Sequence, residues 1–287
     1  MEAYIPNILE KISDKSDIKE IRRVFGGDIN LSFFTRTNEK AYFIKLQPGK
    51  GKDFFHPEVV GLKTLQATNT VHVPNVFGYG EINNISYLVL KWIDGRKQSH
   101  TEILLGESLA NLHHTFGDAH GFQEDNWIGK LPQRNGIHSS WLEFFRNERL
   151  DVQFSLASKL GRLPESLNKD AIKLLDRLDR WIPEEVPPSL LHGDLWSGNW
   201  IPGPEGIPYF IDPAVYYGHR EVDIAFSELF GGFSNQFYEA YHYGYPIDPE
   251  YKERKPLYQL YYLLVHLNLF GRSYLSSVDQ VVKRYVK

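Results

Sequence analysis

The apolar residues of this 287-residue chain change their spacing near residue 95. Before that point, short runs rich in β-branched and aromatic residues predict strands at three places: 20–47, 75–80 and 86–92. Over 57–67 the apolar residues recur about every three positions, which predicts a helix. We therefore expect the first part of the chain to form a small antiparallel sheet with one helix.

After residue 95 the spacing of the apolar residues is mostly helical. Helices are predicted at 100–116, 138–158, 168–182, 219–230, 234–243 and 255–275. Two short strands are predicted near 199–201 and 208–211, and Asp94-Gly95 is expected to act as a hinge. The expected fold is therefore α+β and bilobal, with a β-rich lobe over 1–94 and a larger helical lobe over 95–287. Ligand pockets commonly form where such lobes meet.

A polar segment in the second part carries the strongest chemical signal. It reads Leu-Leu-His-Gly-Asp-Leu-Trp-Ser-Gly-Asn-Trp over 190–200 and places Asp194 and Asn199 five residues apart. A second carboxylate, Asp212, follows the apolar run Tyr-Phe-Ile and is expected at a strand end. Phosphoryl transfer from ATP needs a carboxylate that orients and deprotonates the acceptor hydroxyl, and oxygen ligands for Mg²⁺. The pattern favours a small-molecule kinase with Asp194 as base and Asn199 and Asp212 as metal ligands.

Each of these three residues also has an ordinary structural explanation. Asp194 could cap a helix or a turn, which is the usual position of an aspartate in a loop. Asn199 could be a turn residue, and Asp212 could simply end a strand before a proline. Each explanation is plausible alone, but all of them together at these spacings would be a coincidence.

A lysine and a glutamate in the first part are candidates for positioning the phosphates. Lys45 lies inside the apolar run Phe-Ile-Lys-Leu, where an ammonium group needs a partner or access to water. Glu58 shares a helix stripe with apolar residues and needs a cation. The two side chains would pair if the helix packs on the sheet. The alternatives are a strand lysine that points outward and a first-turn glutamate favoured by the helix dipole.

Gly26 and Gly27 lie between two predicted strands. A glycine pair in this position can let backbone N–H groups approach a phosphate, although most such pairs form hairpin turns. Neither a Walker A pattern nor G-x-G-x-x-G is present. The pair alone is weak evidence for a nucleotide site.

Composition excludes several classes of function. The chain has no cysteine, which excludes disulfides, thiolate metal sites and cysteine nucleophiles. The formal net charge is −4 and no basic patch is evident, so no nucleic-acid partner is expected. No histidine pair has metal-binding spacing, and no Gly-x-Ser-x-Gly sequence supports a serine hydrolase. His113 and His114 are expected to cap a helix C-terminus, and His192 to support its loop.

No segment predicts a membrane or secretory protein. The N-terminus has no signal-peptide pattern, and the most apolar stretch, 257–270, is interrupted by polar residues and is short for a bilayer span. A cytoplasmic enzyme without a membrane partner is expected. Its oligomeric state cannot be predicted, because symmetric interfaces leave no local pattern.

Together these segments resemble the fructosamine kinase (ketosamine-3-kinase) family. This family belongs to the protein-kinase-like small-molecule kinases, with the aminoglycoside phosphotransferases and choline kinases. His-Gly-Asp194 with Asn199 is shared across that wider group, and the resemblance spans nearly the whole chain. The segments typical of fructosamine kinases are Leu191-His-Gly-Asp-Leu-Trp-Ser-Gly-Asn199, Asp212-Pro-Ala214, Tyr217-Gly-His-Arg-Glu-Val-Asp223, Pro256-Leu-Tyr-Gln-Leu-Tyr-Tyr-Leu-Leu264 and His266-Leu-Asn-Leu-Phe-Gly271. The resemblance implies a bilobal protein-kinase-like fold.

The resemblance also implies an activity. A ketosamine is the sugar adduct that glycation forms on an amine, and the implied reaction transfers phosphate from ATP, with Mg²⁺, to its 3-hydroxyl. The 3-phosphate makes the adduct unstable, so the amine is freed and the protein is repaired by deglycation. By motif position, Lys45 and Glu58 form the phosphate-positioning pair.

The resemblance adds two further groups of site residues. The backbone of Lys91, Trp92 and Ile93 would meet adenine. Trp196 would face the sugar, and an aromatic ring suits both the C–H face of a sugar and a cationic amine. The alternative is that Trp196 only packs under the catalytic loop. Asp223 is expected to steady the loop near Asp212 rather than touch substrate.

The resemblance leaves several questions open. Some family members carry an oxidation-sensitive cysteine in the glycine-rich loop, and this chain has none there. The alternative enzymes are a kinase for another hydroxylated amine, such as an aminoglycoside or choline, and a hydrolase with paired carboxylates. A pseudokinase that only binds is a further alternative. Preference between fructosamines and ribulosamines, and between free and protein-bound substrates, cannot be predicted.

Overall fold

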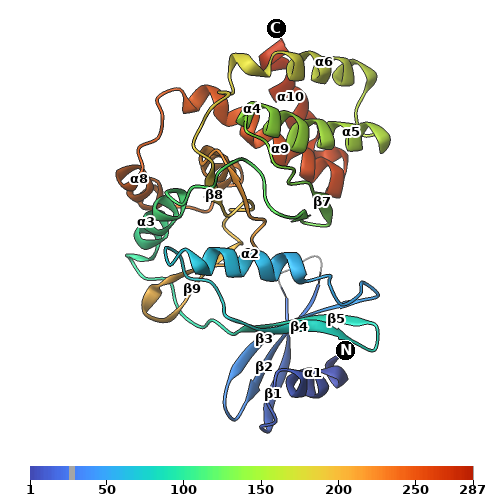
Figure 1. The fold of residues 1–287 in the computed structure, drawn as a ribbon, viewed down its shortest axis with the longest axis vertical. Coiled ribbons are helices and arrows are strands. Elements are labelled where there is room, and N and C mark those ends of the chain that lie inside the picture. The colour runs from blue at the N-terminus through green and yellow to red at the C-terminus, as the bar shows by residue number, and fades with distance from the viewer. Residues whose placement is uncertain (26–29, 287) are drawn as a thin grey trace. The chain divides into compact units, whose positions relative to one another are not determined.

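The structure is a computed structural model that describes residues 1–25 and 30–286 (Figure 1). Gly26 and Gly27 therefore lie outside the described residues. The chain forms two compact units, each formed by two segments. Unit 1 comprises Met1–Thr101 and Trp200–Asp212, and unit 2 comprises Glu102–Asn199 and Pro213–Lys287. The predicted lobe limits, 1–94 and 95–287, stay a prediction.

Unit 1 is built on a five-stranded antiparallel sheet in the order β1-β2-β3-β5-β4. Its strands are β1 (Ile18–Val24), β2 (Leu31–Thr37), β3 (Ala41–Pro48), β4 (Val76–Ile82) and β5 (Ile85–Lys91). Its helices are α1 (Ile5–Lys11) and α2 (His56–Ala67). The predicted strands and the predicted helix are confirmed, whereas α1 was not predicted.

The helices α1 and α2 cover opposite faces of this sheet (Figure 1). Alternate side chains of β3, Tyr42, Ile44 and Leu46, share a buried cluster with residues of α1. Lys45 lies between them in the strand, so its side chain points to the other face, where α2 lies. The alternation along β3 therefore separates an apolar core from a charged position.

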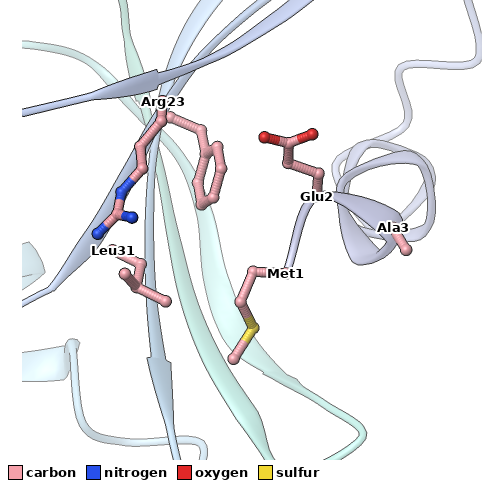
Figure 2. Close-up of a pocket in the computed structure, with 6 residues that line it drawn as sticks. Met1, Glu2, Ala3, Arg23 and Leu31 are labelled. Carbon is pink, nitrogen blue, oxygen red and sulfur yellow. The ribbon is translucent and has the colours of Figure 1, made fainter.

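A pocket of about 330 Å³ lies beside α1, at the start of the chain. Figure 2 shows Met1, Glu2 and Ala3 on one side of it and Arg23 and Leu31, from β1 and β2, on the other. Leu31 pairs with Leu46, so this part of the pocket lies on the α1 face of the sheet, opposite the Lys45 side chain.

Asp14 connects the end of α1 to the sheet. Its carboxylate accepts hydrogen bonds from the Ser16 backbone N–H at 2.9 Å, the Tyr42 hydroxyl at 2.7 Å and the Thr37 hydroxyl at 3.0 Å. Burial alone would raise the pKa of Asp14, but a hydrogen bond from the Ser16 hydroxyl at 2.6 Å, together with the bonds above, outweighs it and lowers the pKa to about 2. The folded state therefore favours the charged carboxylate.

Replacing Asp14 with asparagine is expected to lower the free energy of unfolding by about 2 kcal/mol at neutral pH, because charge-assisted hydrogen bonds are lost. The folded pKa lies below the ordinary value of 3.8, so this stabilisation is complete above that value and disappears as the pH falls through about 2. Urea denaturation of both proteins across this range measures it. A difference between the two proteins that stays constant down to pH 2 would contradict the assignment.

The segment Trp200–Asp212 belongs to unit 1 although it follows the helical part of the sequence. It forms the antiparallel pair β9 (Trp200–Pro202) and β10 (Pro208–Phe210), which confirms the two short strands predicted there. The Phe210 N–H donates to the His72 carbonyl at 2.8 Å. A Cβ at Gly95 would lie 1.9 Å from the Gly203 carbonyl oxygen. Glycine at 95 is thus required for a close backbone approach, and a hinge at this position stays a prediction.

Unit 2 is mainly helical. Its helices are α3 (Thr101–His113), α4 (Trp141–Phe144), α5 (Asp151–Lys159), α6 (Glu165–Asp176), α7 (Glu221–Leu229), α8 (Asn235–Gly244), α9 (Tyr251–Phe270) and α10 (Leu275–Val286). Two strand pairs complete it: β6 (Asn126–Ile128) with β7 (Leu131–Gln133), and β8 (Ser189–Leu191) with β11 (Tyr216–Gly218). The helix α9 is largely buried and packs against α5, α7 and α10. Within the described ranges, no helix is long and apolar enough to cross a membrane.

The predicted helices of this unit are confirmed with three changes, the first being that the helix predicted over 168–182 is α6, Glu165–Asp176. The helix predicted over 138–158 is divided into α4 and α5 by a π-helical turn, Phe145–Leu150. The helix predicted over 255–275 ends at Phe270, because Gly271 has a φ of +94° that a helix cannot accommodate. The separate helix α10 was not predicted.

Candidate active site

Unit 1 brings together a lysine and two carboxylates. The Lys45 Nζ atom lies 2.8 Å from Glu58 Oε1 on α2 and 2.6 Å from Asp212 Oδ1, which follows β10. The pairing of Lys45 with Glu58 is the one predicted from the strand and the helix stripe. The contact with Asp212 was not predicted, because 167 residues separate it from Lys45.

The two carboxylates keep Lys45 charged. Its side chain is only 6 % exposed, and burial alone would lower the pKa of an amine. The charges of Asp212 and Glu58 outweigh burial and leave the pKa of Lys45 raised. The Asp212 side chain is 47 % exposed, so it can also bind a group arriving from solvent. An ammonium fixed beside an accessible carboxylate suits a phosphate and its metal ion.

Asp212 has an uncommon backbone conformation. Its φ of +52° lies in the left-handed region, which side chains other than glycine adopt infrequently. The residue also precedes a proline. Such strained residues are concentrated at ligand-binding and catalytic sites, so this position is a candidate for function on backbone grounds alone.

Unit 2 contains the other two residues of the predicted catalytic motif. The amide nitrogen of Asn199 donates to Asp194 Oδ2 and to the Asp194 carbonyl oxygen, both at 2.8 Å. Because the nitrogen makes both bonds, the carbonyl oxygen of Asn199 is the atom that remains for a cation. Amide and carboxylate oxygens are suitable ligands for Mg²⁺. In the described part of the chain, no three His, Asp or Glu side chains gather as a separate metal cluster.

The backbone before Asp194 is fixed by a buried carboxylate. The His192 N–H donates to Asp223 Oδ2 at 2.7 Å, and the Gly193 N–H donates to Asp223 Oδ1 at 2.9 Å. Asp223 lies in the first turn of α7 and is 0 % exposed. Asp223 therefore steadies the loop His192–Gly193 and not the loop near Asp212 that was predicted.

Two further contacts hold the same loop. The ring of His192 accepts a hydrogen bond from the Asp194 N–H at 3.2 Å, so this histidine supports the loop as predicted. The Tyr262 hydroxyl on α9 donates to the Gly193 carbonyl at 2.8 Å. This role of Tyr262 was missed. The available signal was a tyrosine within a buried helix, since a buried phenol needs a hydrogen-bond partner.

Gly193 is required by its conformation and by its neighbour. Its φ is +81°, and a Cβ at this position would lie 2.0 Å from the Ala214 carbonyl oxygen. The Ala214 N–H donates to the His192 carbonyl at 2.9 Å, so the two backbone segments are in direct contact. No rotation of a side chain can relieve a clash between two backbone positions.

Replacing Gly193 with alanine is therefore expected to lower the free energy of unfolding by about 2 kcal/mol, because the backbone must move to avoid the clash. Urea denaturation measures the change. Gly161→Ala is the matched control for φ, since Gly161 has a φ of +63° but nothing within 4 Å of its Cβ position. Equal losses in the two variants would show that the contact with Ala214 does not matter.

Trp196 is 40 % exposed, and its indole lies over Gly198. A Cβ at Gly198 would approach the ring to 2.2 Å, so the small residue makes room for the indole. Much of the ring remains accessible to a ligand. This arrangement is compatible with sugar binding, and that role stays a prediction.

The backbone N–H groups of the three residues predicted to meet adenine differ in their hydrogen bonds. The N–H groups of Lys91 and Trp92 already donate to the carbonyls of Asn75 and Ala41, at 2.8 and 3.0 Å. Among the described residues, no backbone hydrogen bond from the Ile93 N–H is found. The contact of adenine with the backbone of Lys91, Trp92 and Ile93 stays a prediction, and the Ile93 N–H is the one of these donors without a backbone partner among the described residues.

Comparisons with known proteins agree with this chemistry. A family model described as fructosamine kinase matches residues 1–287. A probable ketoamine kinase of Enterococcus faecium is 42 % identical over 94 % of this chain and 98 % of its own length. A chloroplastic protein-ribulosamine 3-kinase of Arabidopsis thaliana is 35 % identical over 95 % of this chain and 84 % of its own. A crystal structure from Haemophilus somnus, assigned as a fructosamine-3-kinase, has a TM-score of 0.87 and 30 % identity, and the match covers 100 % of this chain and 98 % of that chain.

Proposed function

Because this chain belongs to the fructosamine kinase family, we propose that it transfers phosphate from ATP to the 3-hydroxyl of ketosamines. The observation that carries the proposal is identity to ketoamine and ribulosamine kinases over nearly the whole chain. The charged groups support it, since a buried lysine held by two carboxylates and an Asp–Asn pair are the groups that phosphoryl transfer requires.

We assign one role to each residue of the candidate site. Asp194 orients the sugar 3-hydroxyl and accepts its proton as the oxygen attacks the γ-phosphorus and the bond to the β–γ bridging oxygen breaks, which releases ADP. Lys45, positioned by Glu58, binds phosphate oxygens of ATP. The Ile93 N–H binds adenine, and Trp196 packs on the sugar.

The donor set also fits the expected metal ion. Asn199 offers an amide oxygen and Asp212 an accessible carboxylate, which are the hard oxygen ligands that Mg²⁺ prefers. When bound, Mg²⁺ neutralises charge on the phosphates and holds them for transfer. The chain's own contribution is to hold these oxygens in place through the Asn199 hydrogen bonds and the Lys45 ion pair.

The phosphorylated product explains a repair function. The 3-phosphate leaves more readily than a hydroxyl, so enolisation of the neighbouring carbonyl expels inorganic phosphate by elimination. Water then hydrolyses the resulting imine, which frees the amine and leaves a 3-deoxy dicarbonyl sugar. Both small and protein-bound ketosamines present the same 3-hydroxyl and are proposed substrates. Because ATP is the phosphoryl donor, we expect the reaction to take place in the cytoplasm.

Release of ADP from ATP and Mg²⁺ tests this function. The acceptors compared are ribuloselysine, fructoselysine, an aminoglycoside and choline. We expect turnover with at least one of the two ketosamines and release of free lysine after phosphorylation. Turnover of the aminoglycoside or choline alone would overturn the substrate assignment. ATP binding without turnover of any acceptor would instead indicate a binding protein of kinase shape.

A further inference from the structure

Within unit 2, the buried side chains of His113, Tyr241 and Arg220 form a line of hydrogen bonds that ends at Asp223. His113, the last residue of α3, is 0 % exposed, and its Nε2 atom lies 3.2 Å from Asp223 Oδ2. Its Nδ1 atom lies 2.8 Å from the hydroxyl of Tyr241 on α8. That hydroxyl also lies 3.1 Å from a guanidinium nitrogen of Arg220. The prediction that His113 and His114 cap their helix is wrong, because their ring nitrogens bond to groups of other elements.

The chemistry of the two ends sets the direction of these bonds. Arg220 can only donate, so the Tyr241 oxygen accepts from it and the Tyr241 O–H is directed to His113 Nδ1. The Asp223 carboxylate can only accept, so His113 donates its Nε2–H there. Burial lowers the pKa of His113, in agreement with a neutral ring that donates on one side and accepts on the other.

Asp223 is the point where this line meets the catalytic loop. Its Oδ2 atom accepts from both His113 and the His192 N–H, and its Oδ1 atom accepts from the Gly193 N–H. A carboxylate can rotate easily about its last torsion. A third donor beside the two backbone N–H groups restricts that rotation. Because the same carboxylate holds the His192 and Gly193 N–H groups, the third donor also restricts the loop that ends at Asp194.

We propose that His113 is a positioning residue for the reaction: with Tyr241 and Arg220 behind it, it fixes the Asp223 carboxylate and thereby the backbone that presents Asp194. The proposal rests on the proposed function for its kinetic consequences. A displacement of about 1 Å at a catalytic group can lower a rate about a hundredfold, so loss of the line acts on turnover. Binding of ATP depends on other residues and is expected to remain.

The kinetic experiment compares three variants with the wild-type protein. His113→Phe keeps the ring but removes both nitrogen atoms, and kcat is expected to fall about tenfold, with the KM for ATP within about twofold. His113→Gln has an amide that can both donate and accept, and it is expected to retain about a third or more of kcat. His114→Phe is the control, because His114 neighbours His113 but its ring nitrogen lies against the Gly244 carbonyl.

Hydrogen exchange provides a second measurement that does not depend on the reaction. The amides of His192 and Gly193, followed in a peptide over 189–196, are expected to exchange about tenfold faster in His113→Phe. Peptides from α9 and the same peptide of His114→Phe are expected to exchange as in the wild type. If the wild-type protein phosphorylates no ketosamine, the proposed function fails, while this measurement still tests the line.

Three results would overturn the proposal. The first is wild-type exchange at 192–193 in folded His113→Phe. The second is equal loss of kcat in His113→Phe and His113→Gln, since the hydrogen bonds would then not matter. If His113→Phe does not fold, Tyr241→Phe takes its place, with about threefold faster exchange and about threefold lower kcat expected. The third result that would overturn the proposal is wild-type exchange together with wild-type kcat in Tyr241→Phe.

Discussion

Replacing Asp194 with asparagine is expected to lower kcat about a thousandfold while the affinity for ATP changes less than about threefold. An amide has the size of a carboxylic acid but cannot accept the proton of the acceptor hydroxyl. The bond from Asn199 to the Asp194 carbonyl does not involve the side chain, so the loop is expected to keep its position. The loss therefore falls on the chemical step.

ADP release measures kcat, and calorimetric titration with a non-hydrolysable ATP analogue measures affinity. The control is Asp170→Asn, which removes a carboxylate of α6 that lies near the surface and pairs, among the residues that the structure describes, with Lys173. That variant is expected to behave as the wild type, because surface ion pairs contribute little. A kcat within tenfold of the wild-type value in Asp194→Asn would remove Asp194 from the role of base.

Replacing Lys45 with methionine is expected to lower kcat/KM a few hundredfold and the free energy of unfolding by about 3 kcal/mol. Methionine has a similar length, so the loss is chiefly that of the charge. The phosphates lose their ammonium partner. Glu58, whose side chain is 17 % exposed, is left as a nearly buried carboxylate without a cation.

A double variant separates these two effects. Adding Glu58→Gln to Lys45→Met removes the unpaired carboxylate, so stability is expected to recover in part while activity does not. Lys63→Met is the control, since Lys63 is an exposed lysine of the same helix as Glu58. If the double variant regained activity together with stability, Lys45 would be a structural residue rather than a phosphate ligand.

Local patterns predicted most elements of the fold but missed two helices and the short strands β6, β7, β8 and β11. The helix α1 has only seven residues, and its buried residues Ile5, Ile8 and Leu9 form a pattern too short to distinguish from a loop. The helix α10 has apolar residues at helical spacing, but the predicted helix before it was extended through Gly271. A glycine after a long apolar run was the available signal for an end there.

The sequence predicted which residues form the candidate site, but, apart from one ion pair, not which of them contact each other. The carboxylates and the amide of the motif were recognised from their spacing, and Lys45 from its position inside an apolar strand. The bonds from Lys45 to Asp212 and from His113 to Asp223 join residues 167 and 110 positions apart. No local pattern encodes such pairs. For the same reason, the union of Trp200–Asp212 with the sheet-containing unit could not be foreseen.

The left-handed backbone at Asp212 shows a conflict between folding and chemistry. Glycine would relieve a cost on the order of 1 kcal/mol there. Such a chain would fold at least as well, yet Lys45 would lose its second anion and the proposed metal ligand would disappear. A sequence optimised for thermal resistance alone would therefore drift toward an inert protein at this position. In a screen that selects only for stability, a stabilising substitution at residue 212 should therefore be tested for loss of activity.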